Sequence, residues 1–165
     1  MTQPPPEDLV STAAERPTLE RFLDLYRDNV VAKLTGASEE EARRRLVPSL
    51  TTLGGVVKHL RWVEYGWFHQ LLGARTGDHR REHEREWEFT VQPDDTVSSL
   101  VADYRAVCAR SRAFAARHTL DDVVPHFSMG EVSLRWMMVH MIEETARHAG
   151  HLDIVSEQLQ VSRTH

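Results

Sequence analysis

The sequence has a single cysteine, Cys108, among its 165 residues, which excludes an internal disulfide and a cysteine-based metal site. It has no run of about 18 or more apolar residues, so we expect no membrane-spanning helix and no membrane partner. The net charge is −5 and the arginines are interspersed with glutamates, so no nucleic-acid partner is expected either. Residues 1–8 lack the basic and apolar regions of a signal peptide, and we therefore expect a cytoplasmic protein.

What the chain does have is the composition of a globular protein, 41% hydrophobic and 27% charged. Its length suits one domain with a sizeable core. Residues 1–16 are rich in proline and polar side chains, which predicts a flexible N-terminal arm. Residues 17–160 carry helical patterns throughout, and we expect them to form the single domain.

Apolar residues recur at intervals of three and four in four long segments, which is typical of amphipathic helices. The expected helices cover 17–35, 50–72 with Ser49 as the capping residue, 96–116 and 131–159. Four such helices predict an all-α fold, a four-helix bundle with long connecting loops. Bundles of this kind build metal sites from side chains that point inward from facing helices.

Three shorter segments complete the prediction. Ser38 is followed three residues later by Glu41, the spacing of a capping box, so a short helix should begin there. The segment 74–94 is charged and is expected to be a loop that Trp87 and Phe89 anchor to the body. The segment 117–130 is also expected to be a loop, in which residues 127–129 could form a short extended piece.

The last expected helix carries a polar stripe. His140, Glu144, His148 and His151 follow one another at steps of four, four and three residues, which return to one helix face. Imidazole and carboxylate groups one turn apart can hold one divalent ion. Both Glu144 with His148 and His148 with His151 have that spacing, and His140 is expected to flank the pocket. The stripe therefore predicts part of a metal site.

A second helix must supply a further ligand, and His59 is the best candidate. Its neighbours Val56, Leu60 and Val63 place it within or beside the buried face of the helix 50–72. Alone, such a histidine is best explained as a core residue bonded to a backbone carbonyl. Together with the stripe, it is better explained as a ligand. Two imidazoles and one carboxylate leave a coordination position open, which permits catalysis.

These two segments resemble the DinB/YfiT-like superfamily. The stretch 53–60 with 64–68 is similar to its second helix. The stretch 143–153 is similar to the last helix of the branch once called DUF664, now grouped with mycothiol and bacillithiol S-transferases. The resemblance covers residues 17–160 and implies an antiparallel four-helix bundle, often a homodimer. It also implies a metal triad of His59, Glu144 and His148, with His151 as a fourth ligand or a group that tunes His148.

The resemblance implies an activity as well. A divalent metal, zinc by preference with nickel, manganese or iron as alternatives, would activate a low-molecular-weight thiol such as mycothiol as its thiolate for S-conjugation of an electrophile. The alternatives are a thiol-dependent isomerase, a non-catalytic metal-binding stress-response bundle and a purely structural bundle. Arg61 and Arg147 could hold carboxylate or sugar groups, although surface pairing explains each better. His126 lies in a loop that could line a pocket. The four tryptophans are expected mostly in the core, and one of them could also line the pocket: Trp62, Trp67, Trp87 and Trp136.

Overall fold

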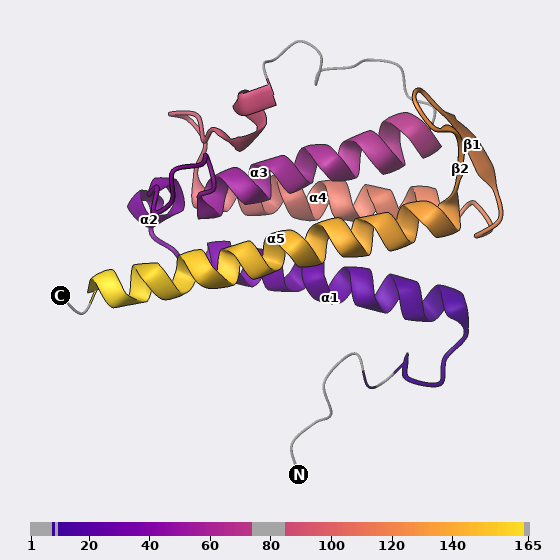
Figure 1. Cartoon of the computed structure of the whole chain (residues 1–165), viewed down its shortest axis with the longest axis horizontal. Coiled ribbons are helices and arrows are strands. Elements are labelled where there is room, and N and C mark those ends of the chain that lie inside the picture. The colour runs from indigo at the N-terminus through magenta and orange to yellow at the C-terminus, as the bar shows by residue number, and fades with distance from the viewer. Residues whose placement is uncertain (1–7, 9, 74–84, 164–165) are drawn as a thin grey trace.

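The computed structural model describes residue 8 and residues 10–73 and 85–163, and it is mostly helical (Figure 1). In chain order its elements are α1 (Glu15–Thr35), α2 (Glu39–Arg43), α3 (Leu53–Glu64), the π-helix η2 (Tyr65–Leu72), the 3₁₀ helix η3 (Arg85–Phe89), α4 (Val97–Ala115), the strands β1 (Val123–His126) and β2 (Gly130–Ser133), and α5 (Leu134–Arg163). The predicted bundle of four long helices is confirmed: α1, α3 continued by η2, α4 and α5. No helix in the described ranges is long and apolar enough to cross a membrane.

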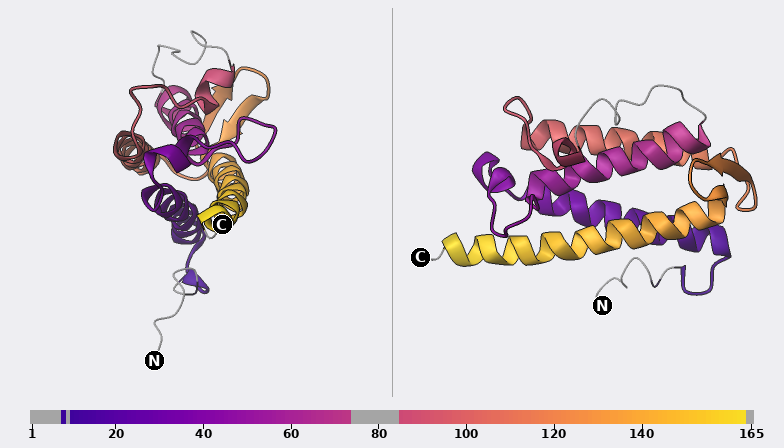
Figure 2. Two further views of the ribbon diagram at one scale, coloured as in Figure 1. Left: turned by 90° about the vertical axis from the view of Figure 1, so that its left-hand side faces the viewer. Right: turned by 45° about the horizontal axis from the view of Figure 1, so that its top comes forward.

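The helices run in two directions (Figure 1 and Figure 2). Ion pairs join Glu15 to Arg135 near the start of α1 and α5, and Lys33 to Asp153 further along both, so these two helices are parallel. Helices α3 and α4 run the opposite way. Antiparallel contacts therefore form between α3 and α5 and between α1 and α4. Because α3 and α4 are parallel, η2 ends at one end of the bundle and α4 begins near the other, which explains why the sequence has a long segment between them.

The helix starts agree only partly with the predicted caps. At α2 the capping box is present, with Ser38 Oγ accepting from the Glu41 amide and the Glu41 carboxylate accepting from the Ser38 amide. The prediction of Ser49 as the cap of the second long helix is wrong. Thr52 caps α3, and its Oγ1 accepts a hydrogen bond from the Gly55 amide. Helix α1 begins at Glu15, two residues before the predicted start at residue 17. Pro17 then lies in the first turn, where proline is tolerated because its missing N–H needs no partner.

The predicted continuous helix over 50–72 changes its winding after Glu64. The eight residues of η2 form a π-helix, whose hydrogen bonds span five residues instead of four. Successive side chains in η2 are therefore separated by a smaller rotation about the helix axis than in an α-helix. Apolar periodicity does not distinguish the two windings over so short a stretch, so this change could not be predicted from the residue pattern.

The predicted loop over 117–130 contains part of a β-hairpin. Strand β1 pairs antiparallel with β2, with Val123 opposite Ser133 and His126 opposite Gly130. Residues 127–129, expected to be extended, form the turn instead. Gly130 follows with a φ of 79°, in the left-handed region that favours glycine. The two strands are too short for a clear alternation pattern, which is why they were not expected.

The core has two apolar clusters with a buried ion pair between them. One cluster packs around Val30, Leu60 and Leu152, and the other around Leu23 and Met141. Between them, the guanidinium of Arg27 donates two hydrogen bonds to the fully buried carboxylate of Glu64, at 2.7 and 2.8 Å. Such a pair is costly to break because either group alone would be a buried, unpaired charge.

Candidate metal centre

The three residues predicted as a triad lie together across the α3–α5 interface. His59 comes from the middle of α3, and Glu144 and His148 lie one turn apart on α5. Glu144 Oε1 is 3.3 Å from Nε2 of His59 and 3.3 Å from Nε2 of His148. One ligand atom from each residue lies within 4.8 Å of the other two, so the group could hold a metal ion.

His59 is held on its far side by η3. Its Nδ1 lies 3.2 Å from Oε2 of Glu88, a buried carboxylate, and its ring stacks on Phe89 with the centroids 4.1 Å apart. An imidazole that donates Nδ1–H to a carboxylate can offer the lone pair of Nε2 to a metal once the Nε2 proton, here directed at Glu144, has left. Glu88 thereby fixes both the tautomer and the orientation of the candidate ligand.

Gly54 and Gly55 allow η3 to approach α3 this closely. A Cβ at Gly55 would lie well under 3.0 Å from the Phe89 carbonyl oxygen, and one at Gly54 would lie 2.8 Å from a methyl of Val91. Both positions therefore need glycine for space. Gly55 lies one turn before His59, so the close approach sets Glu88 and Phe89 directly against the imidazole.

The hydrogen bonds of the triad favour the charged forms of Glu144 and His59. Hydrogen bonds from His148 and His59 hold the pKa of Glu144 well below its usual range. Burial opposes the charged form of His59, which is 8% exposed, but its hydrogen bonds to Glu144 and Glu88 outweigh burial and raise its pKa. The triad thus keeps a charged carboxylate between two imidazoles, and a cation can replace the imidazole proton.

The donor set fits a divalent metal. Two imidazole nitrogens and one carboxylate oxygen are the ligands that zinc and its transition-metal neighbours prefer. His148 Nδ1 is buried and has no hydrogen-bond partner among the described residues, so this ring, unlike that of His59, has its hydrogen-bonding capacity only half used.

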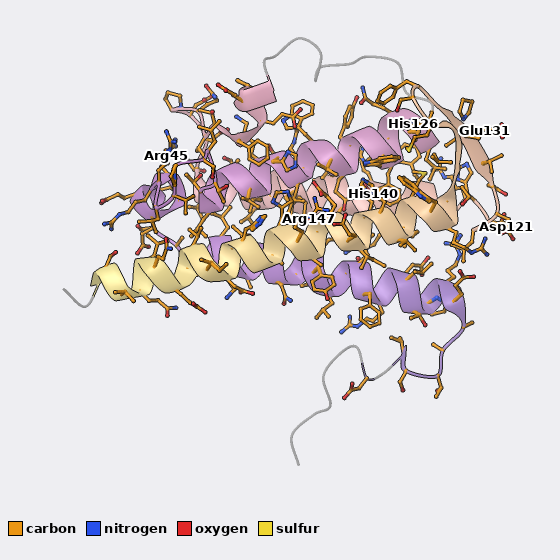
Figure 3. The ribbon with its side chains drawn as sticks, in the orientation of Figure 1. Arg45, Asp121, His126, Glu131, His140 and Arg147 are labelled. Carbon is orange, nitrogen blue, oxygen red and sulfur yellow. The ribbon has the colours of Figure 1, made fainter. Side chains whose placement is uncertain are left out.

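The remaining members of the stripe lie outside the triad. His151 is exposed, with its ring 5.4 Å from that of His148, and is not part of the group that could hold a metal. His140 is half-buried one turn before Glu144 and packs against Trp67 and Trp136. Figure 3 labels His140 on the edge of α5 that faces α3. His140 therefore flanks the triad on α5.

The other candidates have local partners. Arg147 is ion-paired with Glu143 and lies 3.5 Å from Glu144 Oε2. Arg61 stacks over the ring of Trp62, 4.4 Å from its centroid. Cys108 is buried, as expected, and burial raises the pKa of its thiol. It is therefore a packing residue.

Sequence reasoning missed Glu88 and gave Phe89 only a role as an anchor. Both residues lie in a charged segment with no helical periodicity. Nothing in a single sequence pairs that segment with His59, 29 residues earlier than Glu88. The Gly-Gly pair before His59 was the available signal, because adjacent glycines in a buried helix indicate close approach of another backbone.

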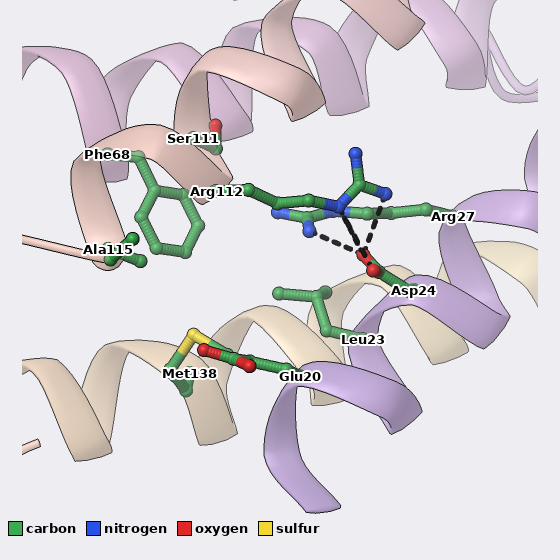
Figure 4. A pocket seen from close by; sticks show the side chains of 10 residues that line it. Glu20, Leu23, Asp24, Arg27, Phe68, Ser111, Arg112, Ala115 and Met138 are labelled. Carbon is green, nitrogen blue, oxygen red and sulfur yellow. Dashed lines mark hydrogen bonds and ion pairs between the residues drawn. The ribbon is translucent and has the colours of Figure 1, made fainter. Parts of the chain in front are cut away.

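A cavity of about 190 Å³ is lined mainly by residues of α1 and α4, with Phe68 of η2 and Met138 of α5 (Figure 4). Leu23, Phe68 and Met138 form its apolar lining, and Asp24 is bonded there to both Arg27 and Arg112. No member of the triad lines it, and its arginines are already paired with a carboxylate. This cavity is therefore separate from the triad, which lies between α3 and α5.

The fold and the triad define a class of protein, a helical bundle with a candidate His–Glu–His metal centre between its second and last long helices. A model of the Mycothiol-S-transferase family matches residues 18–160, and the chain belongs to this family. The match confirms the resemblance to the mycothiol transferase branch of the DinB/YfiT-like superfamily. No curated protein matches the sequence.

Proposed function

We propose that the chain is a divalent-metal-dependent transferase that conjugates a mycothiol-like thiol to an electrophile. The observation that carries this proposal is the triad of His59, Glu144 and His148, together with family membership. A divalent ion bound by these residues would lower the pKa of a thiol and favour the thiolate. Zinc is the first choice of metal, with nickel, manganese and iron as alternatives.

Each residue at the candidate centre would have a separate role. His59 and His148 each offer one neutral imidazole nitrogen, and Glu144 offers a carboxylate oxygen that offsets one charge of the ion. Glu88 holds a proton on Nδ1 of His59 and so keeps Nε2 available. Phe89 covers one face of His59 and excludes water from it. Three protein donors leave room for the sulfur of the thiol.

The reaction forms one bond from sulfur to carbon. The thiol loses its proton to solvent, and its sulfur then attacks the electrophilic carbon. In a substitution the leaving group departs with its bonding electron pair. In an addition the electrophile takes up a proton. An isomerase of the same family would release the thiol again, so the two activities differ in whether the thiol is consumed.

The test measures metal content and thiol consumption on the same purified protein. After zinc loading and gel filtration, elemental analysis should find zinc bound to the wild-type chain. Zinc affinity should fall by more than about 100-fold in His148→Ala, since losing a ligand costs more than losing a group that supports one. His118→Gln is the control, because His118 bonds to the Phe114 carbonyl, away from the triad.

Consumption of mycothiol with monochlorobimane should follow metal content through the same variants. Bound zinc without consumption of mycothiol, bacillithiol or glutathione would instead support a non-catalytic metal-binding bundle. His151→Ala separates a three-residue site from one with a fourth histidine. A homodimer and a cytoplasmic location are further parts of the proposal, and sedimentation velocity tests the first.

A further inference from the structure

Four aromatic rings form a contiguous group beside the triad, which we call the aromatic wall: Trp67, His126, Trp136 and His140. His126 stacks on Trp67 at 5.3 Å, and Trp67 meets His140 edge-on at 4.7 Å. His140 in turn stacks on Trp136 at 5.1 Å, with the ring planes 16° apart. Each ring thus limits the rotation of the next.

The wall continues the line of the metal centre. Trp136, His140, Glu144 and His148 each lie one turn after the last on α5. With a rise of about 1.5 Å per residue, His140 lies about 6 Å and Trp136 about 12 Å along the helix from Glu144. A ring carried on the carbon that reacts at the triad would therefore lie against His140 and the rings next to it.

Two elements that the sequence did not predict, η2 and the β-hairpin, contribute rings to the aromatic wall. The wider winding of η2 accompanies the contacts of Trp67 with Trp136 and His140 on α5. The hairpin brings in His126, whose Nδ1 accepts hydrogen bonds from the amides of Ser128 and Met129 in the turn. Figure 3 labels His126 on the hairpin, near the same end of the bundle as His140.

The wall is not simply part of the core. Trp136 is 42% exposed and His140 and His126 are half-buried, whereas Trp62 is 7% exposed. A single exposed aromatic side chain is ordinary. Rings that fix one another in a line leading to a candidate metal centre offer a preformed surface to a ligand.

The chemistry of this surface favours a flat, weakly polar group. Indole and imidazole faces attract other aromatic rings through offset and edge-on stacking. A polyol would need several hydrogen-bonding groups, and the wall offers only the ring nitrogens, one of which is already engaged in the hairpin turn. We propose that the aromatic wall binds a planar aromatic group of the electrophile and so gives the transferase a preference for aromatic over small aliphatic electrophiles. This inference rests on the proposed function.

The test compares two electrophiles with mycothiol on the zinc-loaded protein. Chlorodinitrobenzene is planar and aromatic, and its reaction forms the S–C bond as chloride leaves with the C–Cl electron pair. Iodoacetamide is small and aliphatic and loses iodide in the same way. In both reactions the thiol proton goes to solvent. The measured quantity is the ratio of kcat/KM for the first electrophile to that for the second.

Trp136→Leu should lower this ratio about 3- to 10-fold through a higher KM for chlorodinitrobenzene, as expected from the loss of one stacking ring. His140→Leu should lower it in the same direction. Ile154→Ala is the control, since Ile154 is 55% exposed on the same helix and lies beyond His148. An unchanged ratio in both wall variants, or a rise in the KM for mycothiol in place of that for the electrophile, overturns the inference.

A binding measurement separates this inference from the proposed function. Dinitroaniline is a planar analogue without a leaving group, and its stacking should quench tryptophan fluorescence in the wild-type protein even where no electrophile is conjugated. Quenching that weakens several-fold in Trp136→Leu supports the wall even if the transferase activity fails. Equal quenching in both proteins, with thiol conjugation intact, overturns the wall alone.

Discussion

Gly55→Ala should weaken metal binding at the candidate centre without altering any of its donor atoms. The added Cβ would collide with the Phe89 carbonyl, which must retreat by about 1 Å to reach ordinary contact at 3.4 Å. That carbonyl belongs to the residue stacked on His59 and follows Glu88 directly. A shift of this size takes the bond between Glu88 and His59, 3.2 Å long, beyond hydrogen-bonding distance.

The expected result follows from what Glu88 does. Without its carboxylate partner, His59 loses its fixed tautomer and orientation, and zinc affinity should fall about 10- to 100-fold. A competition titration against a chromophoric chelator at constant pH measures this change. The NMR signals of the His59 ring report whether its hydrogen bond to Glu88 is lost.

Gly150→Ala is the matched control. Gly150 lies on α5 between His148 and His151, and a Cβ there meets nothing within 4 Å. Alanine at an open helical position should stabilise the protein by up to about 1 kcal/mol and leave zinc affinity unchanged. If Gly55→Ala bound zinc as tightly as the wild-type protein while the contact of Glu88 with His59 was lost, the role assigned to Glu88 would be refuted.

Three other perturbations test the surrounding structure. Arg27→Met should destabilise the fold by about 3–5 kcal/mol in urea unfolding because it leaves the buried Glu64 carboxylate unpaired, whereas adding Glu64→Leu should restore most of that loss. Equal stability of the single and double variants would contradict this reasoning. Glu88→Ala should lower zinc affinity about 10- to 100-fold with little change in helix content by circular dichroism; an unchanged affinity would show that His59 needs no support. In metal-free protein the raised pKa of His59 adds stability that is complete below its ordinary value of 6.5 and is lost as the pH rises through the folded-state value. Urea unfolding across that range should show this decline, and His59→Gln should flatten it.

The candidate triad could be predicted because its information is local. Glu144 and His148 are one helical turn apart, and His59 has apolar neighbours at helical spacing, so two short windows of sequence contain all three residues. Spacing alone also allowed His148 with His151, and the family resemblance selected the triad. The four long helices were predicted for the same reason. Their parallel and antiparallel pairing depends on the path of the connections, which periodicity does not report.

The features that were missed depend on distant contacts. Glu88 meets His59 only because Gly55 lets two backbones approach, and neither residue alone indicates the other. The π-helical winding of η2 depends on packing against neighbouring helices and leaves no composition signal of its own. The hairpin has one marker in the sequence, Gly130, whose positive φ only the structure shows, and its strands are four residues each and half exposed. Local propensity is weak evidence for strands so short.

The placement of His59 and Glu144 on different helices has a consequence for folding. The two residues are 85 positions apart in the chain, so an ion shared by them would act as a reversible cross-link that closes a long loop. An unfolded chain keeps only the neighbouring Glu144 and His148 and binds the ion weakly. Free metal at one hundred times the dissociation constant would then add about 2.7 kcal/mol to the stability of the fold. The supply of the ion in the cell would thereby govern how long each folded molecule survives.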